Sequence, residues 1–213
     1  MWVLFAIVSV LASAALGKDD ICQKRIYEAC DYDHDFVFPN NEKQFDEECS
    51  ILLDESNCRL EYAIKCESDR LEEITEINEF LEDVCRKGSS LNEAIAPNVG
   101  CIKESIMNEC SESTRRVHRN YREYLNTNGG EFSDKKLMCM SLASDAACAV
   151  NAVSVPCGNT VKNAVKQSIR RIDWMEQKNV CTRKLREEIA KDIPTIQISL
   201  SEKVILEELL LDI

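Results

Sequence analysis

Hydrophobic residues recur at steps of three and four in two long stretches of the chain. In residues 71–85 the apolar positions fall on one face of a helix, with mostly glutamate and aspartate between them. Residues 161–175 repeat this spacing. The two stripes are Leu71, Ile74, Ile77, Phe80, Leu81, Val84 and Cys85, and Val161, Ala164, Val165, Ile169, Ile172 and Met175. No run alternates apolar and polar residues for long enough to predict a strand, so we expect an all-α fold.

The first seventeen residues predict a cleaved secretory signal. An apolar run over residues 1–10 continues into small side chains at Ala15 and Gly17, and the polar Lys18 follows at once. The run is too short for a transmembrane span, and no later window approaches eighteen apolar residues. We therefore expect a secreted, extracellular protein with no membrane span. An uncleaved anchor is the alternative, because no basic residue precedes Trp2.

All twelve cysteines follow that signal. An even number in a secreted chain predicts a disulfide framework, because the compartment is oxidising. The sequence does not favour zinc binding or thioredoxin-like redox chemistry, since no Cys-x-x-Cys occurs and only His34 and His118 could add imidazole ligands. We expect six disulfides, and the spacing leaves their pairing open.

The cysteines form two sets with similar spacing. The first set has gaps of 7, 18, 8, 7 and 18 residues, and the second has gaps of 8, 28, 8, 8 and 23. The two sets are Cys22, Cys30, Cys49, Cys58, Cys66 and Cys85, and Cys101, Cys110, Cys139, Cys148, Cys157 and Cys181. The short gaps agree to within one residue, whereas the long gaps differ, as loops do. This order predicts a disulfide-stapled helical bundle made of two duplicated six-cysteine helical units.

The predicted organisation has five segments. They are a signal peptide over residues 1–17, a first six-cysteine helical unit over 18–86, a linker over 87–100, a second six-cysteine helical unit over 101–193, and an apolar and acidic C-terminal tail over 194–213. The tail lies beyond the last cysteine and is rich in aliphatic residues. It either packs on the core or offers an apolar face to a partner helix.

Each unit is expected to contain a helical hairpin that turns between its third and fourth cysteines. Residues 54–57 are rich in side chains that cap helices, and Ser144 and Asp145 hold the matching place in the second unit. The nine-residue step from Cys49 to Cys58 rotates a helix by about 900°, which puts the two cysteines on opposite faces. A turn between them would let both point inward.

The cysteine spacing also indicates a family. The run is Cys49-x8-Cys58-x7-Cys66-x18-Cys85, followed by Cys101-x8-Cys110. With short apolar patches as far as Cys181, it resembles the insect twenty-seven-kilodalton haemolymph glycoprotein family. The resemblance implies a secreted, cysteine-rich, predominantly helical protein of undefined molecular function, and it carries over no catalytic or binding residues. That family is glycosylated, whereas no Asn-x-Ser/Thr occurs in this chain, so a glycan-dependent role is not expected.

An acidic segment after Cys30 has the spacing of a calcium-binding loop. Asp31, Asp33, Asp35 and Glu42 fall at positions 1, 3, 5 and 12, where such a loop places its oxygen ligands. The sharp turn at position 6 calls for glycine, and Phe36 stands there. The second unit has no counterpart. We therefore favour an ordinary acidic connecting loop and expect neither a metal site nor a cofactor.

Each catalytic template that we considered lacks a required part in this sequence. His34 and Asp35 suggest a secreted phospholipase, but the adjacent paired cysteines and glycine-rich calcium loop of such enzymes are absent. No Gly-x-Ser-x-Gly occurs, and two histidines offer little for a Ser-His-Asp triad. Carboxylates are too widespread for one pair to stand out as an acid and a base. We therefore expect no catalytic residues and no enzymatic activity.

The net charge of −12 is concentrated in the first half of the chain. Residues 18–100 carry 9 basic and 22 acidic side chains, and residues 101–213 carry 17 and 16. An acidic chain repels phosphate backbones, so nucleic acid is not an expected partner. Two basic stripes predict either an anion-binding patch or, as we favour, a solvated helix face; docking of such a face on the acidic first unit is a further alternative. The stripes are Arg115, Arg116, Arg119 and Arg122, with His118 and Tyr121, and Lys162, Lys166, Arg170 and Arg171.

Two functions from different classes fit these features. The first is an extracellular, non-enzymatic binding or carrier protein for a small apolar ligand held between helices, or for a protein partner. The second is a structural or storage-type secretory component without a specific ligand. The sequence does not name the ligand-binding residues, and a continuous apolar cavity would favour the carrier.

Overall fold

The computed structural model of this protein describes residues 21–30, 36–128, 134–176 and 181–211. Every regular element in these residues is a helix, which confirms the all-α fold class. Within the same ranges, no helix is long and apolar enough to cross a membrane. The predicted signal peptide, residues 1–17, lies outside the described residues.

The first half is built around a hairpin of two long helices, α3 (Glu42–Lys65) and α4 (Leu71–Cys85). The short elements η1 (Ile21–Gln23) and α2 (Ile26–Ala29) lie against α3. α3 begins after Asn41, whose side-chain oxygen accepts a hydrogen bond from the backbone N–H of Gln44 at 3.0 Å. α4 has the bounds that its apolar stripe predicts.

The second half contains the remaining helices. In chain order they are α5 (Ser90–Ile95), η2 (Ala96–Asn98), α6 (Val99–Thr127), α7 (Asp134–Ser154), α8 (Asn159–Glu176), α9 (Arg183–Asp192), η3 (Ile193–Thr195) and α10 (Leu200–Leu211). The segment predicted as a linker, residues 87–100, is therefore largely helical. Its apolar side chains, including Leu91 and Val99, are buried, so it is part of the packed structure.

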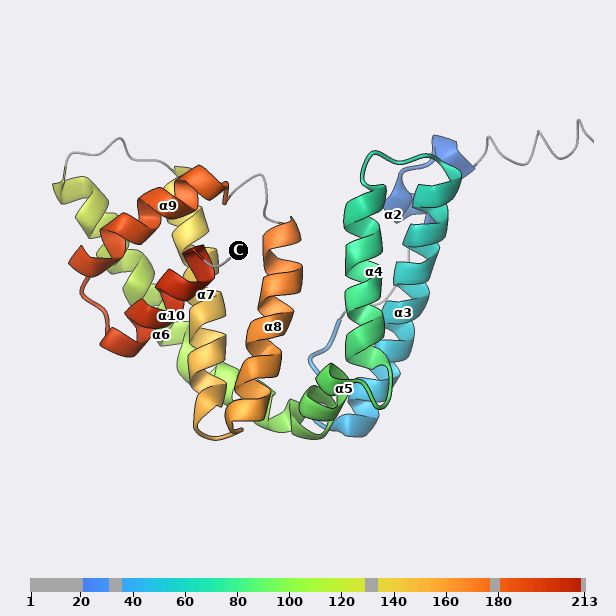
Figure 1. The fold of residues 1–213 in the computed structure, drawn as a ribbon, viewed down its shortest axis with the longest axis horizontal. Coiled ribbons are helices and arrows are strands. Elements are labelled where there is room, and N and C mark those ends of the chain that lie inside the picture. Colours follow the sequence, from blue (N-terminus) through green and yellow to red (C-terminus); the bar gives the residue numbers. More distant parts are fainter. Residues whose placement is uncertain (1–20, 31–35, 129–133, 177–180, 212–213) are drawn as a thin grey trace, which may run out of the picture.

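Figure 1 shows two helical arms that meet at one end. α3 and α4 form one arm, and α6 to α10 form the other. α5 and the start of α6 join the arms at the base, where α5 and α4 both contact α8. α4 and α8 are therefore the helices of the two arms that face each other.

All twelve cysteines are paired, and every disulfide stays within its own half. The bonds are Cys22–Cys66, Cys30–Cys58 and Cys49–Cys85, and Cys101–Cys157, Cys110–Cys148 and Cys139–Cys181. Six disulfides were predicted and are confirmed. In each half the first cysteine joins the fifth, the second joins the fourth, and the third joins the sixth. This common order supports the internal duplication, which stays a prediction.

The predicted turn between the third and fourth cysteines is wrong in both halves. α3 continues through residues 54–57, and α7 continues through Ser144 and Asp145. Cys49 and Cys58 do lie on opposite faces of one helix, and they bond to different neighbours, Cys85 at the end of α4 and Cys30 after α2. The two disulfides therefore hold α3 from opposite faces, one to the end of α4 and one to the residue after α2. The turns lie after the fourth cysteine in sequence, between α3 and α4 and between α7 and α8.

The C-terminal segment packs on the core rather than standing apart. α10 lies on α7, and Leu206, Leu209 and Leu210 are buried in the main hydrophobic cluster of the second half. Its first turn is closed by Ser199 and Glu202, because each side chain bonds the backbone N–H of the other residue. The alternative in which this helix turns its apolar face to a partner therefore does not hold for these leucines.

Candidate functional site

An apolar cavity of about 340 Å³, partly open to solvent, is lined by residues of α3, α4, α6 and α8. Both halves of the chain contribute to it, together with the segment before α3 and the end of α5. The lining residues are Phe36, Phe38, Pro39, Phe45, Glu48, Cys49, Leu52, Phe80, Leu81, Val84, Cys85, Ile95, Val99, Ile102, Ile106, Ala149, Val165, Ser168 and Ile169. Glu48 and Ser168 are the polar side chains among them, so the wall is almost wholly apolar.

Helical periodicity brings these side chains together. On α4, Phe80, Leu81 and Val84 are spaced so that they share one face, and this face turns toward the second arm. On α8, Val165 and Ile169 are one turn apart and face the first arm. Both predicted apolar stripes therefore supply side chains to the cavity.

The disulfide between Cys49 and Cys85 forms part of the wall. It fixes the end of α4 to the middle of α3, and Phe45 and Leu52 extend the same face of α3 by one turn in each direction. This wall is therefore covalently held, and its shape does not depend on side-chain packing alone.

An extended segment before α3 closes one side of the cavity. The Nζ atom of Lys103 on α6 donates hydrogen bonds to the backbone oxygen of Phe38 at 2.8 Å and to Oδ1 of Asn40 at 2.7 Å. A Cβ atom at Gly100 would stand 2.7 Å from the Asn40 backbone oxygen, so only glycine permits this approach. The ring of Phe36 is 56% exposed and meets the edge of the Phe38 ring at 6.3 Å between centroids.

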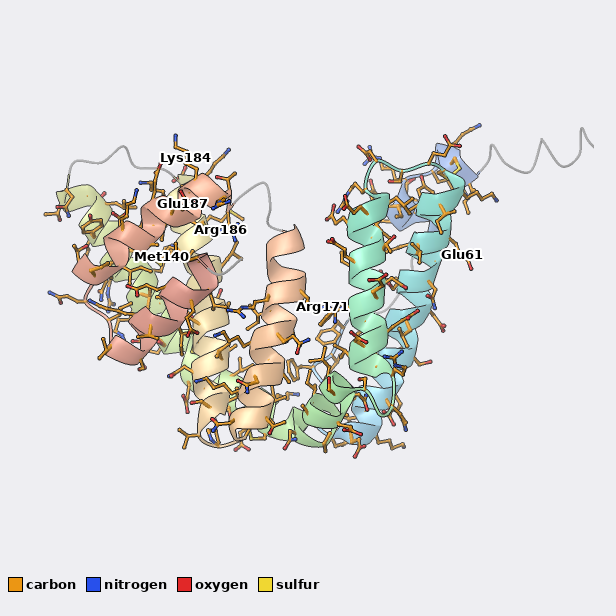
Figure 2. The ribbon with its side chains drawn as sticks, in the orientation of Figure 1. Glu61, Met140, Arg171, Lys184, Arg186 and Glu187 are labelled. Carbon is orange, nitrogen blue, oxygen red and sulfur yellow. A yellow bond between two sulfur atoms is a disulfide. The ribbon has the colours of Figure 1, made fainter. Side chains whose placement is uncertain are left out.

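A cluster of charges lies beside the cavity, where α8 meets α4. Arg171 donates a hydrogen bond from Nη1 to the Asp83 carboxylate at 2.7 Å, and Figure 2 shows it in the gap between the two helices. Its guanidinium carbon lies 5.2 Å from the centroid of the Phe80 ring, which lines the cavity. The other Asp83 oxygen accepts from Arg86 at 3.2 Å. Two guanidinium groups therefore share one carboxylate.

Glu202 joins the last helix to α6 far from the cavity. Its carboxylate accepts hydrogen bonds from the Ser113 hydroxyl at 2.5 Å and from Arg116 at 3.0 Å, while Ser199 binds its second oxygen. Burial by itself raises the pKa of Glu202, but these hydrogen bonds and the charge of Arg116 outweigh burial, so the pKa lies below its ordinary value of 4.5. Glu202 is thus an ionised anchor of the fold.

A second buried polar cluster joins α6 to α9. The hydroxyls of Tyr121 and Tyr124 donate to the two oxygens of Asp192 at 3.0 and 3.2 Å, and the two rings stack. Burial, followed by the charge of Asp192, raises the pKa of Tyr121 well above its ordinary value. The neutral phenol is therefore the stable form, and this cluster serves packing between helices rather than proton transfer.

A shallower pocket of about 320 Å³ lies at the end of α6 and has a polar wall. Asn120, Glu123, Thr127 and Gln197 are among its lining residues. The Asn120 amide already donates to the backbone oxygen of Gln197 at 2.7 Å. This hydrogen bond holds the α9–α10 connection against α6, and the polar wall distinguishes this pocket from the apolar cavity.

The candidate metal residues are only partly within the described structure. Asp31, Asp33 and Asp35 lie outside it, and Glu42 is the first residue of α3. Among the residues that the structure describes, no three histidine, cysteine, aspartate or glutamate side chains are grouped so that they could hold a metal ion. The calcium loop therefore stays an untested alternative.

The two basic stripes are used differently from each other. On α6, Tyr121 is buried and Arg116 binds Glu202 while its side chain stays 46% exposed, and Arg115 and Arg119 are also exposed. On α8, Lys166 bonds Glu208 of α10, and Arg171 bonds Asp83 of the acidic first half. The contact between Arg171 and Asp83 is an ion pair between the two halves, which is the alternative that we favoured less for the charge asymmetry.

Comparisons of the chain with protein-family models, curated proteins and solved structures gave no match. The resemblance to the insect haemolymph glycoprotein family therefore stays a prediction from cysteine spacing.

The sequence does not reveal the cavity directly, because its wall comes from segments as far apart as Phe36 and Ile169. One signal was present in the pattern. Phe36 and Phe38 are large apolar residues in an acidic connection, where a solvated loop has no need of them. Their placement beside α3 and α6 was decided by tertiary contacts.

Proposed function

We propose that this protein is a secreted extracellular carrier, without enzymatic activity, that holds a small apolar ligand between its two arms. The apolar cavity of about 340 Å³ carries this proposal. Ligand sites are typically concave, mostly apolar, and about 300–1,000 Å³ in volume. The cavity meets all three criteria.

The disulfides support the compartment. The protein has six disulfides and no free cysteine. Such a set is expected of a protein that folds in an oxidising environment and is rare in cytosolic proteins. None of them crosses from one half to the other, so the bonds stabilise each arm and leave the space between the arms adjustable. A carrier needs this combination, because its ligand has to enter and leave.

The proposal is tested first on ligand carried by the native protein. The oxidised protein, secreted by eukaryotic cells, is extracted with organic solvent, and the extract is analysed by mass spectrometry. We expect one apolar small molecule in a roughly constant ratio to protein. Repeated absence of such a molecule would favour the structural or storage role.

Binding is then measured with the neutral fluorescent probe N-phenyl-1-naphthylamine on protein freed of ligand. Leu52→Trp fills the cavity from α3, and Leu60→Trp makes the same change at a half-buried position of the same helix that does not line it. We expect saturable binding by the original chain, a loss of about tenfold or more for Leu52→Trp, and no change for Leu60→Trp. The proposal fails if the original chain does not bind, or if both variants lose affinity equally.

A further inference from the structure

We propose that the ligand is a single-chain carboxylic acid, with its hydrocarbon chain in the cavity and its carboxylate on Arg171 in place of Asp83. This inference rests on the proposed carrier function and names the chemistry of its ligand.

Arg171 stands at the edge of the apolar volume. Ser168 and Ile169, which line the cavity from α8, precede it by less than one turn, and its guanidinium lies over the ring of Phe80. Phe80 is only 3% exposed, whereas the side chains of Arg171 and Asp83 are 29% and 40% exposed. The charged pair therefore faces solvent directly beside the buried wall, which is where the head of an amphiphile would lie.

The charge at this edge favours an anion. Asp83 is shared between Arg171 and Arg86, so the three side chains together carry one net positive charge. A carboxylate brought by a ligand would give each guanidinium its own partner, and planar guanidinium groups bind carboxylates through two parallel hydrogen bonds. The existing pair is partly exposed and contributes little stability, so its exchange for a ligand carboxylate costs little.

The charged groups at the edge decide the orientation of such a ligand, because its carboxylate head is attracted to a cation beside the apolar wall. Arg171 offers the opposite charge at the junction of α8 and α4. The ligand therefore places its head at Arg171 and its chain along the apolar wall.

The pocket volume guides the choice of the test ligand. If a methylene group fills about the same 30 Å³ as a water molecule in the liquid, the cavity of about 340 Å³ holds on the order of eleven such groups. Dodecanoic acid is the test ligand of that length. Dodecanol has the same chain and lacks the charge.

The experiment measures displacement of N-phenyl-1-naphthylamine by dodecanoic acid and by dodecanol near neutral pH, on the full secreted chain. We expect the original chain to bind the acid about tenfold more tightly than the alcohol. Arg171→Gln should reduce this preference to about twofold or less and leave the dodecanol affinity unchanged. Asp83→Asn should tighten binding of the acid, because it removes the competing carboxylate.

Two further variants serve as controls. Lys162→Gln removes the same charge from the same helix, at a position that does not line the cavity, and should leave both affinities unchanged. Arg171→Lys keeps the charge without the paired geometry and should retain part of the preference. Unchanged dodecanol binding shows that the Arg171 variants are folded and that the cavity is intact.

The outcomes separate the two proposals. Equal affinities for acid and alcohol in the original chain, or an equal loss of both in Arg171→Gln, would overturn the carboxylate inference while the carrier function stands. Failure of the probe and of both ligands to bind would overturn the carrier function as well.

Discussion

Asn78 on α4 donates a hydrogen bond from its side-chain amide to the hydroxyl of Ser56 on α3, at 3.1 Å, and both side chains are buried. The same amide donates to Oδ1 of Asn57 at 3.0 Å. Ser56 and Asn57 belong to the polar run that predicted a turn, and their actual role is to meet a polar side chain of the neighbouring helix. This contact fixes the register of the α3–α4 hairpin.

Asn78→Ala should lower the free energy of unfolding by about 1–3 kcal/mol, because the buried hydroxyl of Ser56 would lose its hydrogen-bond donor. Urea unfolding followed by circular dichroism measures this loss. Glu79→Ala, at the exposed neighbouring position of α4, should stay within about 0.5 kcal/mol of the original chain. Equal effects for the two variants would mean that the hydrogen bonds contribute nothing specific.

The disulfide between the second and fourth cysteines should contribute similar stability to each half. We expect replacement of Cys30 and Cys58, or of Cys110 and Cys148, by serine to cost about 2–5 kcal/mol each and to depress secretion. Thermal unfolding and the secreted yield measure the effect. Undiminished melting temperature and yield for both pairs would contradict a stabilising framework.

Disulfide mapping tests the separation of the two halves. Trypsin cuts after Arg86 and Lys87, between Cys85 and Cys101, so unreduced peptides report whether a bond crosses this boundary. Mass spectrometry should find no peptide that links a cysteine of residues 22–85 to one of residues 101–181. A single crossing peptide in native protein would show that the arms are covalently joined.

Glu202 should make stability depend on pH in the acid range. Its pKa in the folded protein is depressed, so its stabilisation is present above the unfolded pKa and is lost as the pH falls through the folded value. Glu202→Gln should therefore be less stable than the original chain near pH 7 and lose less stability on acidification below about pH 4.5.

The measurement is the urea midpoint as a function of pH. Glu207→Gln removes the same charge from the same helix, away from Ser113 and Arg116, and serves as the control. Parallel pH profiles for Glu202→Gln and the original chain would show that the carboxylate is not the anchor that its contacts indicate.

The last helix should be essential to the second half. Leu209 is fully buried against the core, so Leu209→Ala should cost about 2–5 kcal/mol through lost burial and an unfilled cavity. Leu211 is 55% exposed on the same helix, and Leu211→Ala should change stability by about 0.5 kcal/mol or less. Thermal and urea unfolding distinguish the two, and a similar cost for both would mean that α10 does not pack as described.

Local pattern predicted the helical class, the apolar stripe of α4 and the number of disulfides. The stripe from Leu71 to Cys85 spans the same residues as α4, because helical periodicity depends on spacing along the chain, and the even cysteine count predicts six disulfides. Local pattern also predicted turns that the structure replaces with the continuous helices α3 and α7.

Tertiary structure decided what spacing alone leaves open. Cys49 and Cys58 are nine residues apart in sequence whether the chain turns between them or continues as a helix. Their disulfide partners, Cys85 and Cys30, show that α3 is continuous and is bonded on two opposite faces. The cavity was likewise decided by tertiary structure. Its wall joins Phe36, Phe80 and Ile169, which no local pattern relates, because the space between helices depends on how they face one another and not on which residues form each helix.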